Sequence, residues 1–325
     1  MKLARRGFLQ LAAGATALPA VSRIARGQAY PTRPVRLIVP FGSAGGTDIV
    51  ARLIGQYLSE RLGQTFVIEN RPGAGGNLGI ETVVRSPPDG YTLALVGAPS
   101  AINATLYDKL NFNFIRDIAP VAAIIRFPNV MVVNPSVPAK TLPEFIAYAK
   151  ANPGKLNMAS PGNGSTPHVT GELFKMMTGV SMVHVPYRSV AAVMTDMLSG
   201  RVQVYFGTTA SMIEYIRAGT LRALAVTTAM RSEILPDIPT VAEFVPGYEA
   251  SAWFGVGAPR NTPAEVVDKL NTEINASLAD PKLKARLVDL GGIAITGSPA
   301  DFTRLIAEET VKWAKVVKFS GAKAE

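Results

Sequence analysis

A glycine-rich stretch, residues 41–48, follows a short apolar run and precedes an amphipathic stretch, and this arrangement suits the binding of an anion. The run 35–39 predicts a buried strand, and the apolar face of 47–62 predicts a helix. The start of a helix carries unpaired N–H groups and a partial positive charge, and glycine lets a ligand reach the backbone. We therefore predict a carboxylate site here, with a ligand-free turn as the alternative. Its candidate ligand-binding residues are Phe41, Gly42, Ser43, Ala44, Gly45, Gly46 and Asp48.

A second stretch with the same organisation covers residues 160–168, between a predicted strand at 156–159 and a predicted helix that begins near residue 167. It offers hydroxyl groups as well as the free N–H groups of the helix start, so it is a second candidate anion site. A purely structural turn is again the alternative. Its candidate ligand-binding residues are Ser160, Gly162, Asn163, Gly164, Ser165 and His168.

Other polar residues stand at the ends of predicted strands and are weaker candidates. Ser100 and Asn103 follow the strand 91–96, where capping of the next helix is the commoner role of such residues. Tyr187 has the means to stack on or hydrogen-bond a ligand, or it packs half-buried. The guanidinium of Arg188 suits a carboxylate if it points inward. Thr208 places a hydroxyl at the end of the strand 202–206.

The sequence argues against catalysis and against a cofactor. It has no cysteine, no Gly-x-Ser-x-Gly motif and only two histidines, so thiolate and multi-histidine metal sites are excluded. The glycine spacing in residues 73–79 imitates a dinucleotide fingerprint. We reject that interpretation because the motif does not close the first strand, and no acidic residue follows a second strand at the required distance. No cofactor is expected, and an enzyme is the least favoured class.

The elements that position the two loops form two sets of alternating strands and helices. The apolar stretches 119–133 and 221–228 are predicted to be strands that cross between the sets. The sequence thus predicts an α/β fold with two lobes, residues 30–125 with 229–325 and residues 126–228. Glycine loops at strand ends face a ligand cleft in such an arrangement.

Residues 1–29 read as an export signal outside the fold. Basic residues precede an apolar stretch at 8–21, and a small-residue cleavage site ends at Ala29. Arg5 and Arg6 also fit a twin-arginine signal, and the choice between this and general secretion stays open. Removal of the five basic residues in this segment lowers the net charge from +9 to +4, by 9 − 5. Such a mild excess gives no reason to expect nucleic-acid binding. We expect a periplasmic protein.

Five segments carry a resemblance to a known family. They are residues 30–35 (YPTRPV), residues 39–48 (VPFGSAGGTD), residues 68–76 (IENRPGAGG), residues 184–188 (HVPYR) and residues 196–202 (DMLSGRV). Together they resemble the receptors of tripartite tricarboxylate transporters, also called Bug proteins. The family usually has Pro-Pro or a similar pair where this chain has Ser43-Ala44, so the identity of the substrate stays open.

The resemblance implies a periplasmic-binding-protein fold of type II, the flytrap kind, in which the loop 160–168 faces the first glycine loop and the turn 73–79 is structural. It also implies capture of a small carboxylate for a membrane transporter with one large and one small integral subunit. We expect the receptor itself to be a monomer. A sensor that presents its closed form to a signalling kinase is the alternative function.

Overall fold

The computed structural model describes residues 30–43 and 46–324. The predicted export signal and two residues of the first glycine loop, Ala44 and Gly45, lie outside them. The elements, in chain order, are β1 Val35–Val39, α1 Gly46–Leu62, β2 Phe66–Asn70, η1 Ala74–Gly76, α2 Asn77–Val84, β3 Thr92–Gly97, α3 Ala98–Leu106, α4 Phe114–Asp117, β4 Ile118–Val133, α5 Leu142–Ala151, β5 Leu156–Ser160, α6 Thr166–Thr178, β6 Met182–Pro186, α7 Val190–Leu198, β7 Val204–Thr208, α8 Thr209–Arg217, β8 Arg222–Val226, η2 Val241–Glu243, β9 Ser251–Pro259, α9 Ala264–Ala279, α10 Pro281–Asp289, β10 Ile293–Ala294 and α11 Pro299–Ser320.

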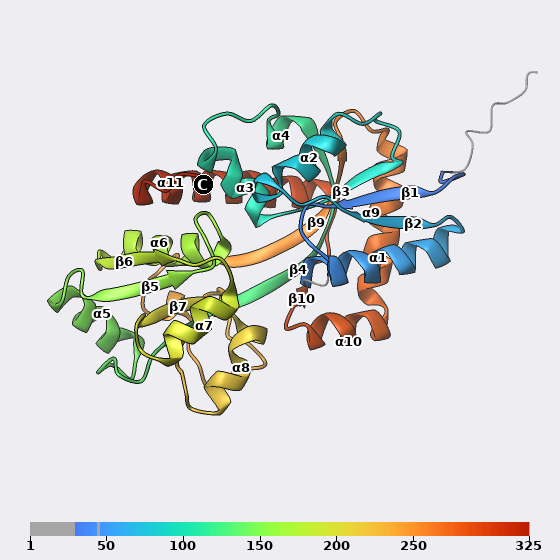
Figure 1. Cartoon of the computed structure of the whole chain (residues 1–325). Coiled ribbons are helices and arrows are strands. Elements are labelled where there is room, and N and C mark those ends of the chain that lie inside the picture. The colour runs from blue at the N-terminus through green and yellow to red at the C-terminus, as the bar shows by residue number, and fades with distance from the viewer. Residues whose placement is uncertain (1–29, 44–45, 325) are drawn as a thin grey trace, which may run out of the picture.

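The chain folds into two α/β lobes, as predicted (Figure 1). The strand order is β2-β1-β3-β9-β4-β7-β5-β6, and β8 and β10 also pair with β4. Strands β1, β2 and β3 are parallel in the first lobe, and β5, β6 and β7 are parallel in the second. A helix follows each of these six strands. Each lobe therefore presents three helix starts at the carboxyl edge of its sheet.

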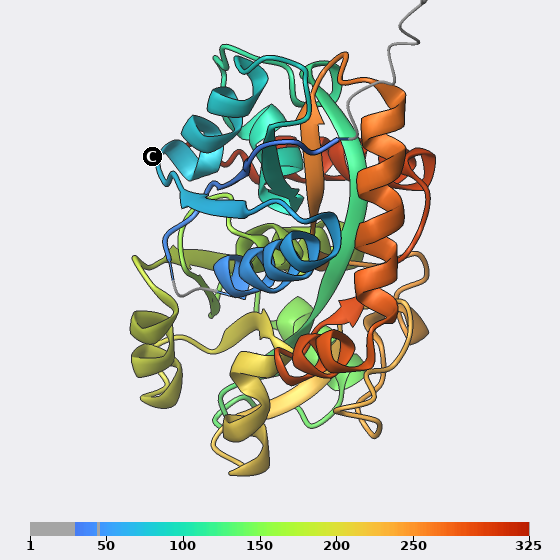
Figure 2. The same ribbon diagram turned by 90° about the vertical axis from the view of Figure 1, so that its right-hand side faces the viewer.

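Strand β4 is the crossing predicted at residues 119–133. Its apolar, β-branched sequence suits a strand that is buried along most of its length. Residues 118–128 pair antiparallel with β9 in the first lobe, whereas residues 129–133 pair with β7 in the second. Figure 2 shows β4 as one long curved strand running between the two lobes.

The second crossing predicted at residues 221–228 is wrong. Strand β8 ends at Val226 and pairs only with residues 130–133 of β4, in the second lobe. The chain then makes a long excursion before β9 runs back along the first-lobe half of β4. A contact between residues far apart in the sequence, which the sequence pattern does not reveal, accompanies this course of the chain. Thr227 accepts a backbone bond from Ala250, and this pairing closes the excursion at the crossing.

The excursion itself packs on the second lobe. The Tyr248 hydroxyl donates to the carbonyl of Thr170 on α6 at 3.0 Å, and its ring contacts Phe174 edge-on. Val226 and Thr240 form a β-bridge. The predicted division gave residues 229–250 to the first lobe. These contacts favour a boundary at Ala250, and the lobe limits remain a prediction.

Helix α11 contacts both lobes, through α3 in the first and α6 in the second. Its buried carboxylate, Glu309, accepts the indole N–H of Trp253 at 3.0 Å and that of Trp313 at 2.8 Å. Lys312 donates to the other oxygen of Glu309 and lies 3.5 Å from Glu249, which also pairs with Arg126 of β4. A satisfied polar cluster therefore joins β4, β9 and α11 where the lobes meet.

Candidate functional site

The two glycine loops lie at the edges where the helices of the two lobes begin. Gly164, in the second loop, has φ +72°, and a Cβ added there would lie 2.2 Å from Leu106 Cδ2 at the end of α3. The second loop therefore touches the first lobe directly. Because Gly164 adopts a left-handed conformation and approaches Leu106 closely, only glycine fits this position without strain.

The described part of the first loop is open. Gly42 and Ser43 are exposed, Phe41 is half-buried, and Gly46 begins α1. A Cβ added at Gly42 or Gly46 would meet no atom within 4 Å. The glycines therefore leave space in front of the backbone, as a site for a ligand requires.

Asp48 fixes the shape of this loop. Its side chain is buried, and its Oδ2 accepts from Arg52 Nε at 2.9 Å. Its Oδ1 accepts from Asn70 Nδ2 at 3.0 Å, and the same amide donates to the carbonyl of Phe41 at 3.0 Å. The hydrogen bond and the charge of Asp48 raise the pKa of Arg52. These contacts favour a positioning role for Asp48 over direct contact with a ligand.

The second loop is held from within by its own polar groups. The Ser165 hydroxyl donates to the carbonyl of Gly162 at 2.7 Å, and Gly164 N–H donates to His168 Nδ1 at 3.0 Å. Ser160 Oγ lies 2.6 Å from His184 Nε2 and 3.0 Å from the Gly162 carbonyl. Ser165 must therefore turn before its proton can reach a ligand, and Ser160 is buried beneath the loop.

The two histidines form a stacked pair under this loop. Their ring centroids are 3.7 Å apart and the rings are 14° from parallel. Burial lowers the pKa of His168 to about 3, helped by the nearby charges of His184 and Lys175. Burial, with Lys175, lowers the pKa of His184 to about 4. Both rings are neutral at neutral pH, and the acceptor role of His168 Nδ1 places its proton on Nε2.

Sequence reasoning passed over His184 as an individual residue, since it entered only as part of a family motif, yet its ring contacts Ser160 and stacks on His168 beneath the second loop. A signal was present in the sequence, because the chain has two histidines and each stands beside a predicted strand end. What joins them is the parallel pairing of β5 and β6, which places Met158 opposite His184 and Ser160 opposite Pro186. That pairing is not local in sequence.

The remaining candidates are mostly engaged elsewhere. The Tyr187 hydroxyl donates to the half-buried Asp196 at 2.8 Å. Burial and then Asp196 raise the pKa of Tyr187 to about 12. Arg188 is exposed. Thr208 precedes α8 at the N-cap position without a side-chain capping bond, and its hydroxyl lies 2.7 Å from Ser211 Oγ.

Ser100 and Asn103 belong to α3, whose start faces the same edge. Ser100 is buried in the first turn of α3. Asn103 Nδ2 donates to the carbonyl of Gly75 at 2.9 Å and to Asn77 Oδ1 at 3.1 Å. Asn103 therefore ties α3 to the glycine turn at residues 73–79, which the family resemblance implies to be structural.

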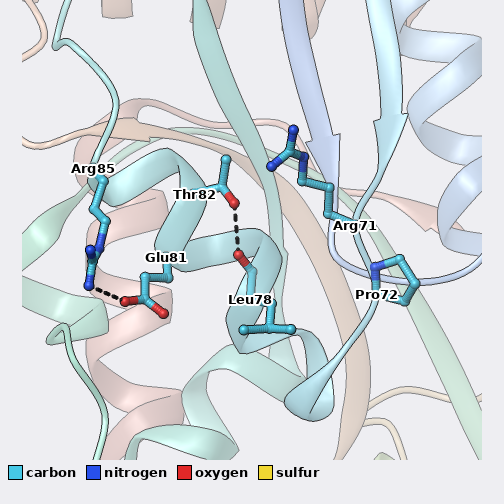
Figure 3. Close-up of a pocket in the computed structure, with 6 residues that line it drawn as sticks. All are labelled: Arg71, Pro72, Leu78, Glu81, Thr82 and Arg85. Carbon is cyan, nitrogen blue, oxygen red and sulfur yellow. Dashed lines mark hydrogen bonds and ion pairs between the residues drawn. The ribbon is translucent and has the colours of Figure 1, made fainter.

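A hollow of about 560 Å³ lies beside α2, between this helix and Arg71 and Pro72 (Figure 3). Arg85 pairs with Glu81 at 2.5 Å, and Arg71 pairs with Glu69 at 2.5 Å. Because both arginines already face a carboxylate, this hollow is a poorer anion site than the two loops. Its lining residues are Arg71, Pro72, Leu78, Glu81, Thr82 and Arg85.

Within residues 30–43 and 46–324, no helix is long and apolar enough to cross a bilayer. The same residues contain no group of three or more His, Cys, Asp or Glu side chains placed to bind a metal.

Known proteins are similar to this chain along most of its length. A family model described as "Tripartite tricarboxylate transporter family receptor" matches residues 50–321. Protein BugT of Bordetella pertussis is 36% identical over 297 residues, which cover 90% of this chain and 91% of BugT. The solved structure of R. palustris Rpa4515 with adipate is 41% identical, with a TM-score of 0.77, and the match covers 90% of this chain and 99% of that one. MatC from Rhodopseudomonas palustris with bound malate is 32% identical, with a TM-score of 0.74 and coverage of 89% and 100%.

Proposed function

Because the chain belongs to the family of tripartite tricarboxylate transporter receptors, we propose that it captures a small carboxylate-containing metabolite between its lobes and delivers it to a membrane transporter. The observation that carries this proposal is that each lobe ends three parallel strands in helix starts, and that Gly164 of the second loop packs against Leu106 of the first lobe. Relatives solved with adipate and with malate support a carboxylate as the ligand.

Binding in this proposal depends on backbone dipoles more than on a formal counter-charge. The first loop offers open backbone at Gly42 and Gly46, and the start of α6 offers further N–H groups. Asp48 and His168 stabilise the conformations of the two loops and do not themselves contact the ligand in this proposal. Further ligand contacts predicted from the sequence remain predictions within this proposal. They are those of Phe41, Ser43, Ala44, Gly45, Ser100, Asn163, Tyr187 and Thr208.

Closure of the lobes would complete the site. Neither lobe alone presents both glycine loops, so a ligand that contacts both binds the closed state more tightly and shifts the equilibrium toward it. The connections that allow such a motion are β4, β9 and α11. Pro128 lies on β4 at the crossing, where its ring fixes one backbone dihedral and concentrates bending on its neighbours.

The cellular setting is part of the proposal. We propose that residues 1–29 direct export and are removed, that the mature protein works in the periplasm as a monomer without catalytic activity, and that its partners are a large and a small integral membrane subunit. The basic start and apolar run of residues 1–29 support export. The family description supports a transporter as the partner.

A thermal-shift screen followed by calorimetric titration tests the ligand class. The purified protein is screened against dicarboxylates, tricarboxylates, amino acids and aromatic acids. A ligand at 100 times its Kd should stabilise the protein by about 2.7 kcal/mol. The matched control is the diamide of each active dicarboxylate, which keeps length and shape but lacks the charge. Equal stabilisation by acid and diamide, or none by any carboxylate, would exclude the proposed function.

A further inference from the structure

Asn77, the first residue of α2, has a buried amide nitrogen without a hydrogen-bond partner. The residue is 6% exposed, and its Nδ2 has no acceptor in the described part of the chain. Buried amide groups are nearly always bonded, so an unpaired donor of this kind indicates that an acceptor is missing.

The contacts around Asn77 fix which side of its amide is unpaired. Asn103 Nδ2 faces the backbone carbonyl of Gly75 at 2.9 Å, which only a donor can satisfy. The same nitrogen lies 3.1 Å from Asn77 Oδ1, so this side of the Asn77 amide must be the acceptor. Turning the Asn77 amide over would place two NH₂ groups against each other. The unpaired atom is therefore a donor and requires an oxygen or nitrogen acceptor.

The first turn of α2, which carries Asn77, lies next to the start of the first glycine loop. A Cβ added at Gly76 would lie 3.2 Å from Pro40 Cβ and 3.5 Å from Phe41 Cε1. A Cβ added at Gly79 would lie 2.9 Å from Pro40 Cα. The first turn of α2 thus packs on the end of β1, where the first loop begins. The partial positive charge of the helix start favours a negatively charged acceptor there.

We infer that Asn77 is a ligand-binding residue whose Nδ2 donates to an oxygen that arrives with the ligand. This inference rests on the proposed function. It extends the ligand site to the glycine turn at residues 73–79, which the family resemblance implies to be structural. The acceptor is a carboxylate oxygen of the ligand or a water molecule that the carboxylate holds. In either case the amide selects an oxygen acceptor at this end of the ligand and disfavours an ammonium group.

The variant Asn77→Asp tests the inference with almost no change of shape. One carboxylate oxygen still accepts from Asn103, while the other replaces the donor by a negative charge. We expect carboxylate affinity to fall at least about tenfold, the loss typical of a charge-assisted hydrogen bond. The melting temperature of the unliganded protein should change little. Asn261→Asp is the matched control, because Asn261 is exposed in the first lobe and the change of charge is the same. Equal affinity in the wild type and Asn77→Asp overturns the inference.

A second variant and crystal structures keep the test decisive if Asn77→Asp folds poorly. Asn77→Ala removes the unpaired donor and should also weaken binding by about tenfold. In a liganded crystal structure, we expect a ligand oxygen, or a water bound to the ligand, within about 3.2 Å of Nδ2. A water at the same position with and without ligand would give the donor a structural role and overturn the inference.

The two proposals fail in different ways. If the wild type binds no carboxylate, the proposed function fails. The inference about Asn77 is then decided by the crystal structures alone. An oxygen of a different ligand class on Nδ2 supports it, and a permanently bound water or an empty position overturns it.

Discussion

Acid should destabilise this protein through His168, and the size of the effect follows from its surroundings. The ring is buried, stacks on His184, and accepts Gly164 N–H at Nδ1. Protonation at Nδ1 would set the Nδ1–H and the Gly164 N–H against each other, and the hydrogen bond that stabilises the second loop would be lost. Burial and the charges of His184 and Lys175 lower the pKa of His168 from 6.5 to about 3.

The sign and the magnitude of the effect come from proton linkage. Between pH 6.5 and about 3, the unfolded chain binds a proton on His168 and the folded protein does not. Stability is therefore fully present above pH 6.5 and falls as the pH decreases toward 3. From pH 7 to pH 5 the loss through this one ring is about 2 kcal/mol, because the slope of about 1.4 kcal/mol per pH unit applies only below pH 6.5, over about 1.5 units.

Urea denaturation at pH 7, 6 and 5 measures this loss, with His168→Asn as the matched variant. Asparagine places an oxygen near the position of Nδ1, so it can still accept Gly164 N–H, but it does not titrate. The wild type should lose about 2 kcal/mol more than His168→Asn between pH 7 and pH 5. His184 is present in both proteins, so its own titration largely cancels. Equal losses in the two proteins would refute the reasoning.

Three further outcomes are expected. Gly46→Val should weaken carboxylate binding about tenfold or more. The melting temperature of the unliganded protein should not change, because a Cβ there meets no atom within 4 Å. If titration calorimetry finds unchanged affinity, the first loop lies outside the site. Asp48→Asn should lower the free energy of unfolding in urea by about 1–3 kcal/mol, since both oxygens of Asp48 are bonded. The same variant should reduce the affinity for amino acids and for plain dicarboxylates equally. A loss confined to amino acids would show that Asp48 meets the ammonium group. Saturating ligand should reduce the radius of gyration in small-angle X-ray scattering, and tight binding without that change would mean a preformed pocket.

Local signals in the sequence predicted the elements well. Thr141 and Ser298 form capping boxes that begin α5 and α11, and both can be read from the sequence because the carboxylate partner stands three residues later. The strand–glycine–helix pattern located both loops, and the apolar run 119–133 became β4. These features depend on residues close together in the chain, where propensity and capping decide the structure.

What the sequence did not predict depends on contacts between distant residues. The short strand β8 has the same apolar character as a crossing strand, and only its pairing with residues 130–133 of β4 distinguishes it from β9. Helix α8 was not predicted at all. The unpaired amide of Asn77 arises from its contact with Asn103, a residue 26 positions away. Such features require the tertiary structure, because a pattern along the chain does not identify the partner.

The buried carboxylate of Glu309 gives the protein a built-in optical probe. The chain has two tryptophans, and both donate their indole N–H to this one side chain. Trp253 lies opposite Arg126 at the crossing of β4 and β9, and Trp313 lies on α11, which contacts both lobes. Any movement of α11 relative to β9 changes the surroundings of both indole rings together. Ligand titrations can therefore follow movement of α11 relative to β9 through intrinsic tryptophan fluorescence alone, with no label attached to either lobe.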